Sequence, residues 1–384
     1  MSENRFTSQW GTYVRRGLAP SRIGGVYVLL ALIVVFSIWV PATFPELATA
    51  RQILNNNSIA ALAALTLVIP MSCGVFDISV PYTMTLSGVI TTYTIVHSDL
   101  PIWLAVLIGL LSALLVGLVN GFVVVTLRID SLIGTLATGF LIQAVVSWRT
   151  GARTVTSDEL SAEFPKLART VWFWGLTLPV FYVLAVAIAA WFLMEHTATG
   201  RRIYATGFNR EAARLAGVRT DRLRYASLII SASLAGITGI VLAAFVGSGS
   251  PQGGSSYLLP AFAGVFLGAT QLKGGRFNAF GTLIAVLLLA TGTTGLGLAR
   301  QPGWVQNLFT GVVLIAALAV TGMQSRQRRA EVEHVDDSDV SDGAAERVPE
   351  PVRELRPHPA TVGEGTPARV LGSDRTTQLR EPTP

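Results

Sequence analysis

Long apolar runs without a charged residue recur along the chain, and they limit its possible folds more than any other feature. They cover residues 23–40, 78–96, 101–127, 131–148, 171–194, 277–299 and 301–323. Most reach the roughly 20 residues that a helix needs to cross a bilayer core of about 30 Å. Because lipid offers the backbone no hydrogen-bond partners, such runs must fold as helices. The pattern therefore predicts an all-α, polytopic membrane protein.

Three less regular segments add to these runs. Residues 51–72 begin with Arg51 and soon carry three asparagines, yet they continue as apolar sequence. Residues 225–247 are apolar with Ser and Gly at intervals, which suits the interior of a bundle because small residues let membrane helices pack closely. Residues 257–272 are short for a crossing, so they could either span the membrane or re-enter. We expect about ten transmembrane helices in all.

Arginine is concentrated in three places, and these set the expected orientation. They are the N-terminal segment 1–22, the loop 196–224 and the start of the C-terminal segment 324–384. Since Lys and Arg mark cytoplasmic segments, all three are expected in the cytoplasm, with an even number of crossings between them. The transmembrane domain is then 23–323, its loop 150–173 is external, and both termini are cytoplasmic. The expected location is the inner (plasma) membrane.

The last 61 residues differ in composition from the rest of the chain. Segment 324–384 is rich in proline, carries mixed charge and has almost no aromatic residues. Such a segment cannot bury enough apolar surface to offset the entropy lost on ordering. We expect a disordered cytoplasmic tail, whose role the sequence does not indicate.

Two Gly/Ser/Pro-rich interruptions follow corresponding helices in two four-span groups, 51–149 and 225–323. The first break is 70–81 and the second is 247–256. The first group would begin outside the membrane and the second inside. Broken helices at matching places in oppositely oriented halves are typical of an inverted repeat with a permeation path between the halves. The alternative is that both are ordinary loops.

The cytoplasmic loop 196–224 contains the pattern of a short helix. Asn209 is a favourable N-cap, Glu211 lies in the first turn where the helix dipole favours negative charge, and Gly217 can end the helix in a left-handed conformation. A helix of two turns is marginal alone in water, so it needs a partner surface. That surface could be another protein or the membrane itself. The residues expected at this contact are Asn209, Glu211, Ala212, Ala213, Leu215 and Gly217.

Four segments of the chain form a set of motifs in a fixed order. They are Gly74-Val-Phe-Asp-Ile-Ser-Val80, Gly117-Leu-Val-Asn-Gly121, Gly207–Gly217 and Leu267–Arg276. Together they resemble the ribose-type permeases of the ATP-binding-cassette importers, a family that also includes branched-chain amino acid permeases. The resemblance covers nearly all of residues 25–323 and depends on the order and spacing of the four segments. It implies that the loop 196–224 couples the permease to a cytoplasmic ATPase. It also implies an external sugar-binding protein and a second permease, either an identical copy or a sister chain.

Polar residues near the breaks are candidates for the translocation path. Asp77, in an apolar stretch, is costly at membrane depth and would face the protein interior or water. Alternatively, Asp77 or Ser79 could cap the helix that follows. Asn120 could contact substrate or hydrogen-bond another helix. Gln252 lies in the second break. The expected path residues are Asp77, Ser79, Asn120 and Gln252.

The sequence lacks the motifs of an ATP-binding or catalytic chain. It has no P-loop, Gly-x-Ser-x-Gly or His-Glu-x-x-His motif, so we expect no enzymatic activity, cofactor or metal. The formal charge of +6 comes from arginines at span ends and in loops, which does not indicate a nucleic-acid partner.

The expected function is a permease subunit that forms the path for a monosaccharide or related polyol and is driven by a separate ATPase. The alternatives are a permease for branched-chain amino acids or nucleosides, and a secondary transporter or channel that needs no ATPase. The sequence does not identify the sugar.

Overall fold

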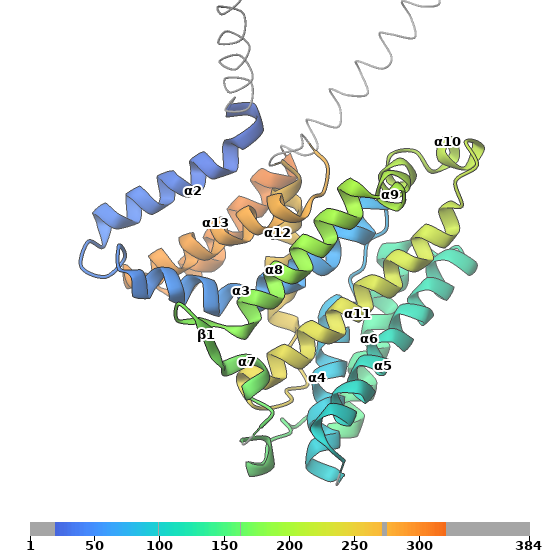
Figure 1. Ribbon diagram of the computed structural model, residues 1–384, viewed down its shortest axis with the longest axis horizontal. Helices are drawn as coiled ribbons and strands as arrows, with labels where there is room; N and C mark the ends of the chain where they lie inside the picture. The colour runs from blue at the N-terminus through green and yellow to red at the C-terminus, as the bar shows by residue number, and fades with distance from the viewer. Residues whose placement is uncertain (1–19, 99, 162, 271–274, 320–384) are drawn as a thin grey trace, which may run out of the picture. The chain divides into compact units, whose positions relative to one another are not determined.

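The computed structural model describes residues 20–98, 100–161, 163–270 and 275–319. This part of the chain is almost entirely helical (Figure 1). Most of the N-terminal segment and the tail 324–384 lie outside the described residues, so the expectation of a disordered tail stays a prediction.

Each of the ten expected spans contains a helix within the described residues. In chain order these helices are α2 (Pro20–Trp39), α3 (Leu47–Ser72), α4 (Val80–His97), α5 (Ile102–Gly121), α6 (Ser131–Thr150), α8 (Leu178–Trp191), α11 (Thr220–Val246), α12 (Leu258–Thr270), α13 (Ala279–Leu298) and Gly303–Ala319. Helices α5 and α8 continue as π-helical turns, η1 (Phe122–Thr126) and η3 (Phe192–His196). Of the described helices, six are long and apolar enough to cross a membrane by length and composition alone. The all-α, polytopic fold is confirmed.

Shorter elements fill the two loops. The loop between α6 and α8 contains η2 (Asp158–Ser161), α7 (Lys166–Arg169) and a hairpin of β1 (Val171–Phe173) and β2 (Leu176–Thr177). The loop between α8 and α11 contains α9 (Ala198–Phe208) and α10 (Arg210–Leu215). Figure 1 shows α9 and α10 at one end of the long helices and α7 at the other, as expected for loops on opposite sides of a membrane.

Local sequence explains where several helices begin and end. Asp130 accepts hydrogen bonds from the amides of Leu132 and Ile133 and so starts α6, and Asn278 accepts one from the amide of Gly281 at the start of α13. Gly247 ends α11 with a φ of 79°, a left-handed conformation that favours glycine.

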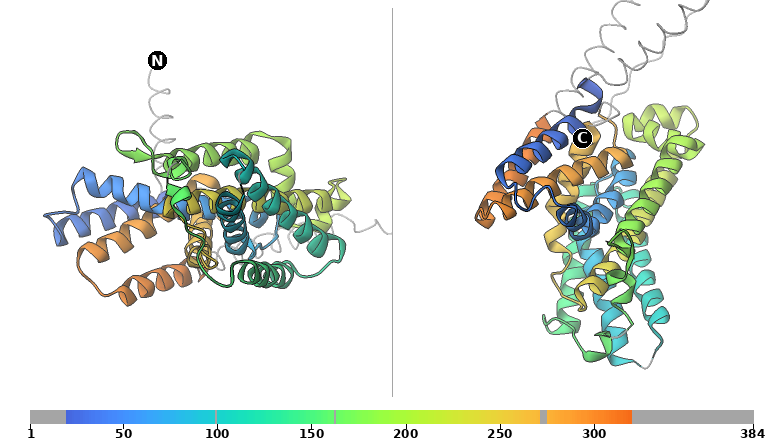
Figure 2. Two further views of the ribbon diagram at one scale, coloured as in Figure 1. Left: turned by 90° about the horizontal axis from the view of Figure 1, so that it is seen from below. Right: turned by 60° about the vertical axis from the view of Figure 1, so that its left-hand side comes forward.

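The packing of the two halves is reciprocal. Helix α3 packs against α12 and α13 of the second half, while α11 packs against α4 and α5 of the first half. Within the halves, α4 packs on α5 and α12 packs on α13. The orange helices at the end of the chain and the teal helices α5 and α6 lie on opposite sides of the bundle (Figure 2). Each half thus contributes its first helix to the other half, the exchange expected of an inverted repeat.

The second break runs along α4 instead of forming a surface loop. A Cβ on Gly249 would lie 2.0 Å from the Thr92 hydroxyl oxygen, and a Cβ on Gly254 would lie 1.9 Å from the Pro81 carbonyl oxygen. The Gly254 amide also donates to the Thr85 hydroxyl at 3.0 Å. Glycine is therefore needed because the backbone lies directly against α4, and α12 starts beside the beginning of α4.

This arrangement answers whether residues 257–272 span or re-enter. With 13 residues, α12 is about 20 Å long, which is too short to cross a bilayer core alone. Its other end leads to Phe277, whose carbonyl accepts a hydrogen bond from Tyr204 of α9 at 2.8 Å. Over the described residues, the extended break and the short helix together reach from the α7 end of the bundle toward the α9 end, which favours a crossing over re-entry.

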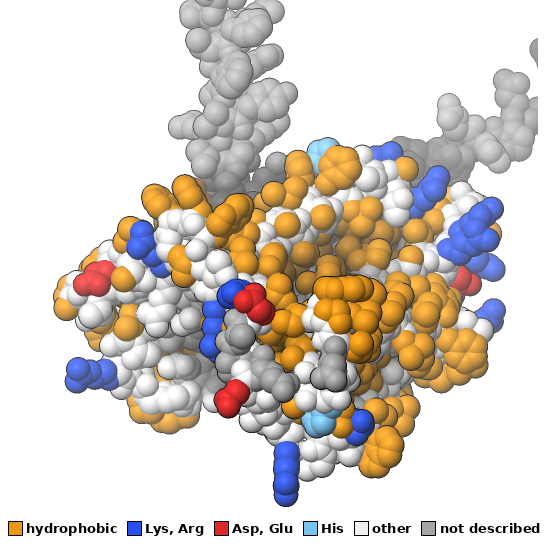
Figure 3. All heavy atoms as spheres, turned by 60° about the horizontal axis from the view of Figure 1, so that its bottom comes forward, with side chains coloured by type: hydrophobic (Ala, Val, Ile, Leu, Met, Phe, Trp, Pro, Cys, Tyr) orange, Lys and Arg blue, Asp and Glu red, His pale blue; other side chains and the backbone are white. Residues whose placement is uncertain are grey.

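Burial separates interior helices from those that face outward. The segment 61–72 of α3 is almost fully buried, whereas α5 exposes Leu107, Leu111, Leu115 and Leu118. Figure 3 shows hydrophobic side chains over much of one face, with charged side chains in small groups. Exposed leucines on long apolar helices are expected where a protein faces lipid.

Candidate functional site

A buried polar cluster joins the first break to both halves of the fold. Asp77 is fully buried, and it accepts hydrogen bonds from the Ser79 hydroxyl at 2.6 Å and the Ser79 amide at 3.1 Å. Its other oxygen accepts from the hydroxyl of Ser231 on α11 at 2.7 Å. Asn120 on α5 donates to the Ser79 hydroxyl at 2.7 Å. Hydrogen bonds from several donors are what a buried carboxylate requires.

The cluster bears on two alternatives left open by the sequence. Ser79 is the N-cap residue of α4, but neither its side chain nor that of Asp77 bonds an amide within α4, and Asp77 accepts from the amide of Ser79 itself. Asp77 instead ties the first break to α11, 154 residues further along the chain. Asn120 was expected to contact substrate or another helix, and it bonds Ser79, the residue just before α4. Its Oδ1 is buried with no hydrogen-bond partner among the described residues.

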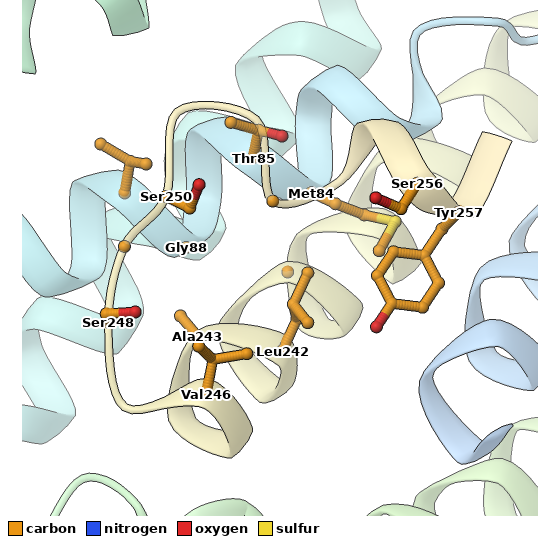
Figure 4. A pocket seen from close by; sticks show the side chains of 14 residues that line it. Met84, Thr85, Gly88, Leu242, Ala243, Val246, Ser248, Ser250, Ser256 and Tyr257 are labelled. Atoms are coloured by element: carbon orange, nitrogen blue, oxygen red, sulfur yellow. The ribbon is translucent and has the colours of Figure 1, made fainter. Parts of the chain in front are cut away.

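A cavity of about 190 Å³ lies between α4, α11 and the second break (Figure 4). Met84, Leu242 and Ala243 form apolar parts of its wall. Valine and glycine residues line more of it, together with five hydroxyl side chains, those of Thr85, Ser248, Ser250, Ser256 and Tyr257. No charged side chain is among the described residues that line this cavity, which we call the chamber.

The four expected path residues do not form one site. Asp77, Ser79 and Asn120 are buried together at the first break. Gln252 is exposed in the second break, between Ser250 and Gly253, which line the chamber. Sequence reasoning missed the chamber itself, because its wall forms only when the second break pairs with α4. Only the glycine-rich composition of the second break indicated that its backbone could lie against a helix.

The short helix expected in loop 196–224 forms with the expected caps. Asn209 accepts a hydrogen bond from the Ala212 amide at 3.0 Å, and Gly217 has a φ of 81°. Glu211 lies in the first turn and pairs with Arg214 at 2.6 Å. These features define α10 and the turn that leads into α11.

The exposed face of α10 is not the alanine face that the sequence predicted would meet a partner. Ala213 is only 6% exposed because it packs inside this chain, so its side chain is not free to meet a partner. Leu215 is 81% exposed and Phe208, at the end of α9, is 72% exposed. Leu215 was among the residues expected at a partner contact, and Phe208 was not. We call Phe208, Ala212 and Leu215 the docking surface, because we propose below that a partner covers them.

Helix α9 lies directly against the first break. A Cβ on Gly207 would lie 2.1 Å from the carbonyl oxygen of Ser72, and Gly74 is next to Gly207 with a φ of 73°. Burial raises the pKa of Tyr204 to about 12, so its hydroxyl stays protonated and donates to Phe277. The docking surface, α9 and the first break are thus in continuous contact.

The opposite loop holds the second break and the end of α11. Val155 and Gly249 exchange backbone hydrogen bonds at 2.9 Å. Arg169 donates to the carbonyls of Phe245 and Val246, at 2.7 and 2.8 Å. Each break therefore contacts a different loop, on opposite sides of the bundle.

Comparison with known proteins places the chain in a family. Residues 49–318 match the family described as "Branched-chain amino acid transport system / permease component". The ribose import permease protein RbsC of Escherichia coli K12 is 30% identical over 301 residues, which cover 76% of this chain and 92% of that protein. The L-arabinose transport system permease protein AraH of the same organism is 31% identical over 306 residues, covering 80% and 92%. RbsC of Haemophilus influenzae is 28% identical over 293 residues, covering 75% and 90%. The chain belongs to this family of transport permeases, the membrane subunits of ATP-binding-cassette importers.

Proposed function

We propose that the chain forms the translocation path of an ATP-driven importer for a neutral sugar. The observation that supports this most directly is the chamber, which offers hydroxyl groups and apolar wall but no charged side chain among its described lining residues. Hydroxyls donate and accept hydrogen bonds, so they can replace the water around a polyol. The relatives named for ribose and L-arabinose transport handle substrates of this class.

A branched-chain amino acid is the second candidate, since the matched family carries that name. Its ammonium and carboxylate groups would both have to leave water to enter the chamber. Desolvating a charge without a partner is far more costly than desolvating a hydroxyl that finds a hydrogen bond. The chamber therefore favours the sugar.

We propose that ATP hydrolysis reaches the path through the docking surface. A partner ATPase would cover Phe208, Ala212 and Leu215, and its movement would pass through α9 to the first break. Gly207 supports this route because it leaves no free space between α9 and the Ser72 carbonyl. The Asp77–Ser231 hydrogen bond would carry the movement from the break to α11 of the other half.

The complete importer would contain two permeases, two ATPase subunits and an external binding protein. The second permease is a further copy of this chain or a sister chain. The proposed orientation rests on arginine, because positive charge marks cytoplasmic loops and this end is therefore cytoplasmic. The arginines lie within α9 and α10 or shortly after them: Arg201, Arg202, Arg210, Arg214 and Arg219. Both termini are then cytoplasmic, in the inner (plasma) membrane.

The chamber can be tested by placing a charge in it. Ser256 lines the chamber and is exposed, so Ser256→Asp should alter the path without disturbing buried packing. In vesicles with the ATPase and binding protein, we expect Ser256→Asp to abolish uptake of a neutral pentose and Ser256→Ala to retain most of it. Pentose uptake by Ser256→Asp equal to that of Ser256→Ala would show that sugar does not pass through the chamber. Leucine uptake in place of pentose uptake by the unmodified chain would favour the second candidate.

A further inference from the structure

A second cavity lies against α4, next to the chamber. It has a volume of about 300 Å³ and lies between the halves of α4 and α6 that end near loop 150–173. Leu86, Ile90 and Val145 are among its aliphatic walls, and Val89 lines both this cavity and the chamber. An occupant of this groove would therefore touch the helix that forms the chamber wall.

A fixed positive charge lies at the end of the groove nearest the helix termini. The guanidinium carbon of Arg149 lies 4.1 Å from the centre of the Tyr93 ring. His97 stacks on the same ring at 4.0 Å with an interplanar angle of 4°, so Arg149 and His97 occupy opposite faces of it. Of the described residues that line the groove, none is acidic, and no ion pair of Arg149 is found among the described residues.

The surroundings of Arg149 place it at a membrane interface. It lies in the last turn of α6, next to Trp148, which is 82% exposed. Exposed tryptophans collect at the level of lipid headgroups, where the ring is partly apolar and the indole N–H is hydrated. The groove below Arg149 extends toward the middle of α4 and α6, and hence toward the hydrocarbon.

We propose that this groove binds one phospholipid of the leaflet at this end of the helices. One acyl chain lies along Leu86, Ile90 and Val145, and the lipid phosphate accepts hydrogen bonds from the Arg149 guanidinium. Charge complementarity selects the phosphate, since guanidinium groups match phosphate oxygens in geometry and charge. The apolar groove favours a lipid over free phosphate, because free phosphate has no apolar part that could pack against the aliphatic walls.

Lipid bound to the purified protein tests this assignment. The unmodified chain and three variants would be extracted in mild detergent and titrated with phosphatidylglycerol, and bound lipid would be counted by native mass spectrometry. Arg149→Gln removes the charge, and Val145→Trp fills the groove at a residue that is 53% exposed. Arg153→Gln is the matched control, because Arg153 lies near Arg149 in sequence but does not line the groove.

We expect one tightly held phospholipid per unmodified chain and per Arg153→Gln chain. Arg149→Gln should need about tenfold more lipid for half-saturation, the factor lost with one charge-assisted hydrogen bond. Val145→Trp should lose the bound lipid although Arg149 remains. If Arg149→Gln weakened lipid binding and Val145→Trp did not, the site would bind only the anionic headgroup, and the proposal would be overturned. Equal lipid binding by all four proteins would also overturn it. A disulfide between two chains carrying Val145→Cys and Cys73→Ser would also overturn it, since a second copy would then cover the groove.

Discussion

The contact between α9 and the first break gives the most direct test of coupling within the chain. In Gly207→Ala, the new methyl group would meet the Ser72 carbonyl oxygen at 2.1 Å and the Gly74 amide nitrogen at 3.1 Å. Ordinary contact with a carbon begins at about 3.5 Å, so α9 or the break must shift by roughly 1.4 Å. Because both partners are backbone, no side chain can rotate away to make room.

The energetic cost follows from two opposing terms. Overpacking of a close contact costs about 1–3 kcal/mol, while Gly→Ala inside a helix such as α9 contributes about 1 kcal/mol of stability. We expect a net loss of about 1 kcal/mol, which is too small to prevent insertion or folding. The functional effect should be larger, since a shift of this size displaces the segment through which the ATPase would act.

The assay is ATP hydrolysis by the reconstituted complex, with and without loaded binding protein. Gly207→Ala should keep normal expression and assembly with the ATPase but lose most of the stimulation. Gly311→Ala is the matched control, since its added methyl group meets no atom within 4 Å. Full stimulation of Gly207→Ala, with assembly unchanged, would refute the proposed route from α9 to the first break.

Three further predictions concern stability and assembly. Ser231→Ala leaves the buried Asp77 carboxylate with one fewer donor, so thermal unfolding should show a loss of about 1–3 kcal/mol, and Ser231→Thr should recover part of it; an unchanged melting temperature would contradict this role. Arg169→Ala should speed hydrogen exchange at the end of α11 but not in α13, and equal rates would show that Arg169 does not hold that end. Deleting residues 331–384 should leave assembly with the ATPase intact, and failure to co-purify would make the tail a docking element.

The helices could be predicted from the sequence because their causes are local. Apolar length determines a span, and a residue such as Asn209 or Gly217 determines where a short helix begins or ends. The breaks could be recognised for the same reason, since Gly, Ser and Pro interrupt helices wherever they cluster. The crossing of residues 257–272 could not, because it depends on where the second break lies against α4.

The candidate site was less predictable because its parts come from distant segments. Asp77 has a local explanation as a cap, yet its Ser231 partner is 154 residues away. Ala212 and Ala213 are adjacent alanines of α10, and nothing local distinguishes them. Packing inside the chain buries Ala213 and leaves Ala212 exposed. The sequence carries no signal that Gly207 would meet Ser72, because close approach of two backbones depends on the whole bundle.

Sugar accumulation in sealed vesicles tests the central claim most directly. The permease would be reconstituted with its ATPase and with binding protein on the side of loop 150–173, and labelled ribose or arabinose would be followed with ATP on the other side. We predict accumulation above the equilibrium level that requires ATP hydrolysis and stops when the ATPase is inactive. Sugar movement that only equalises concentrations, at the same rate without the ATPase, would contradict the account.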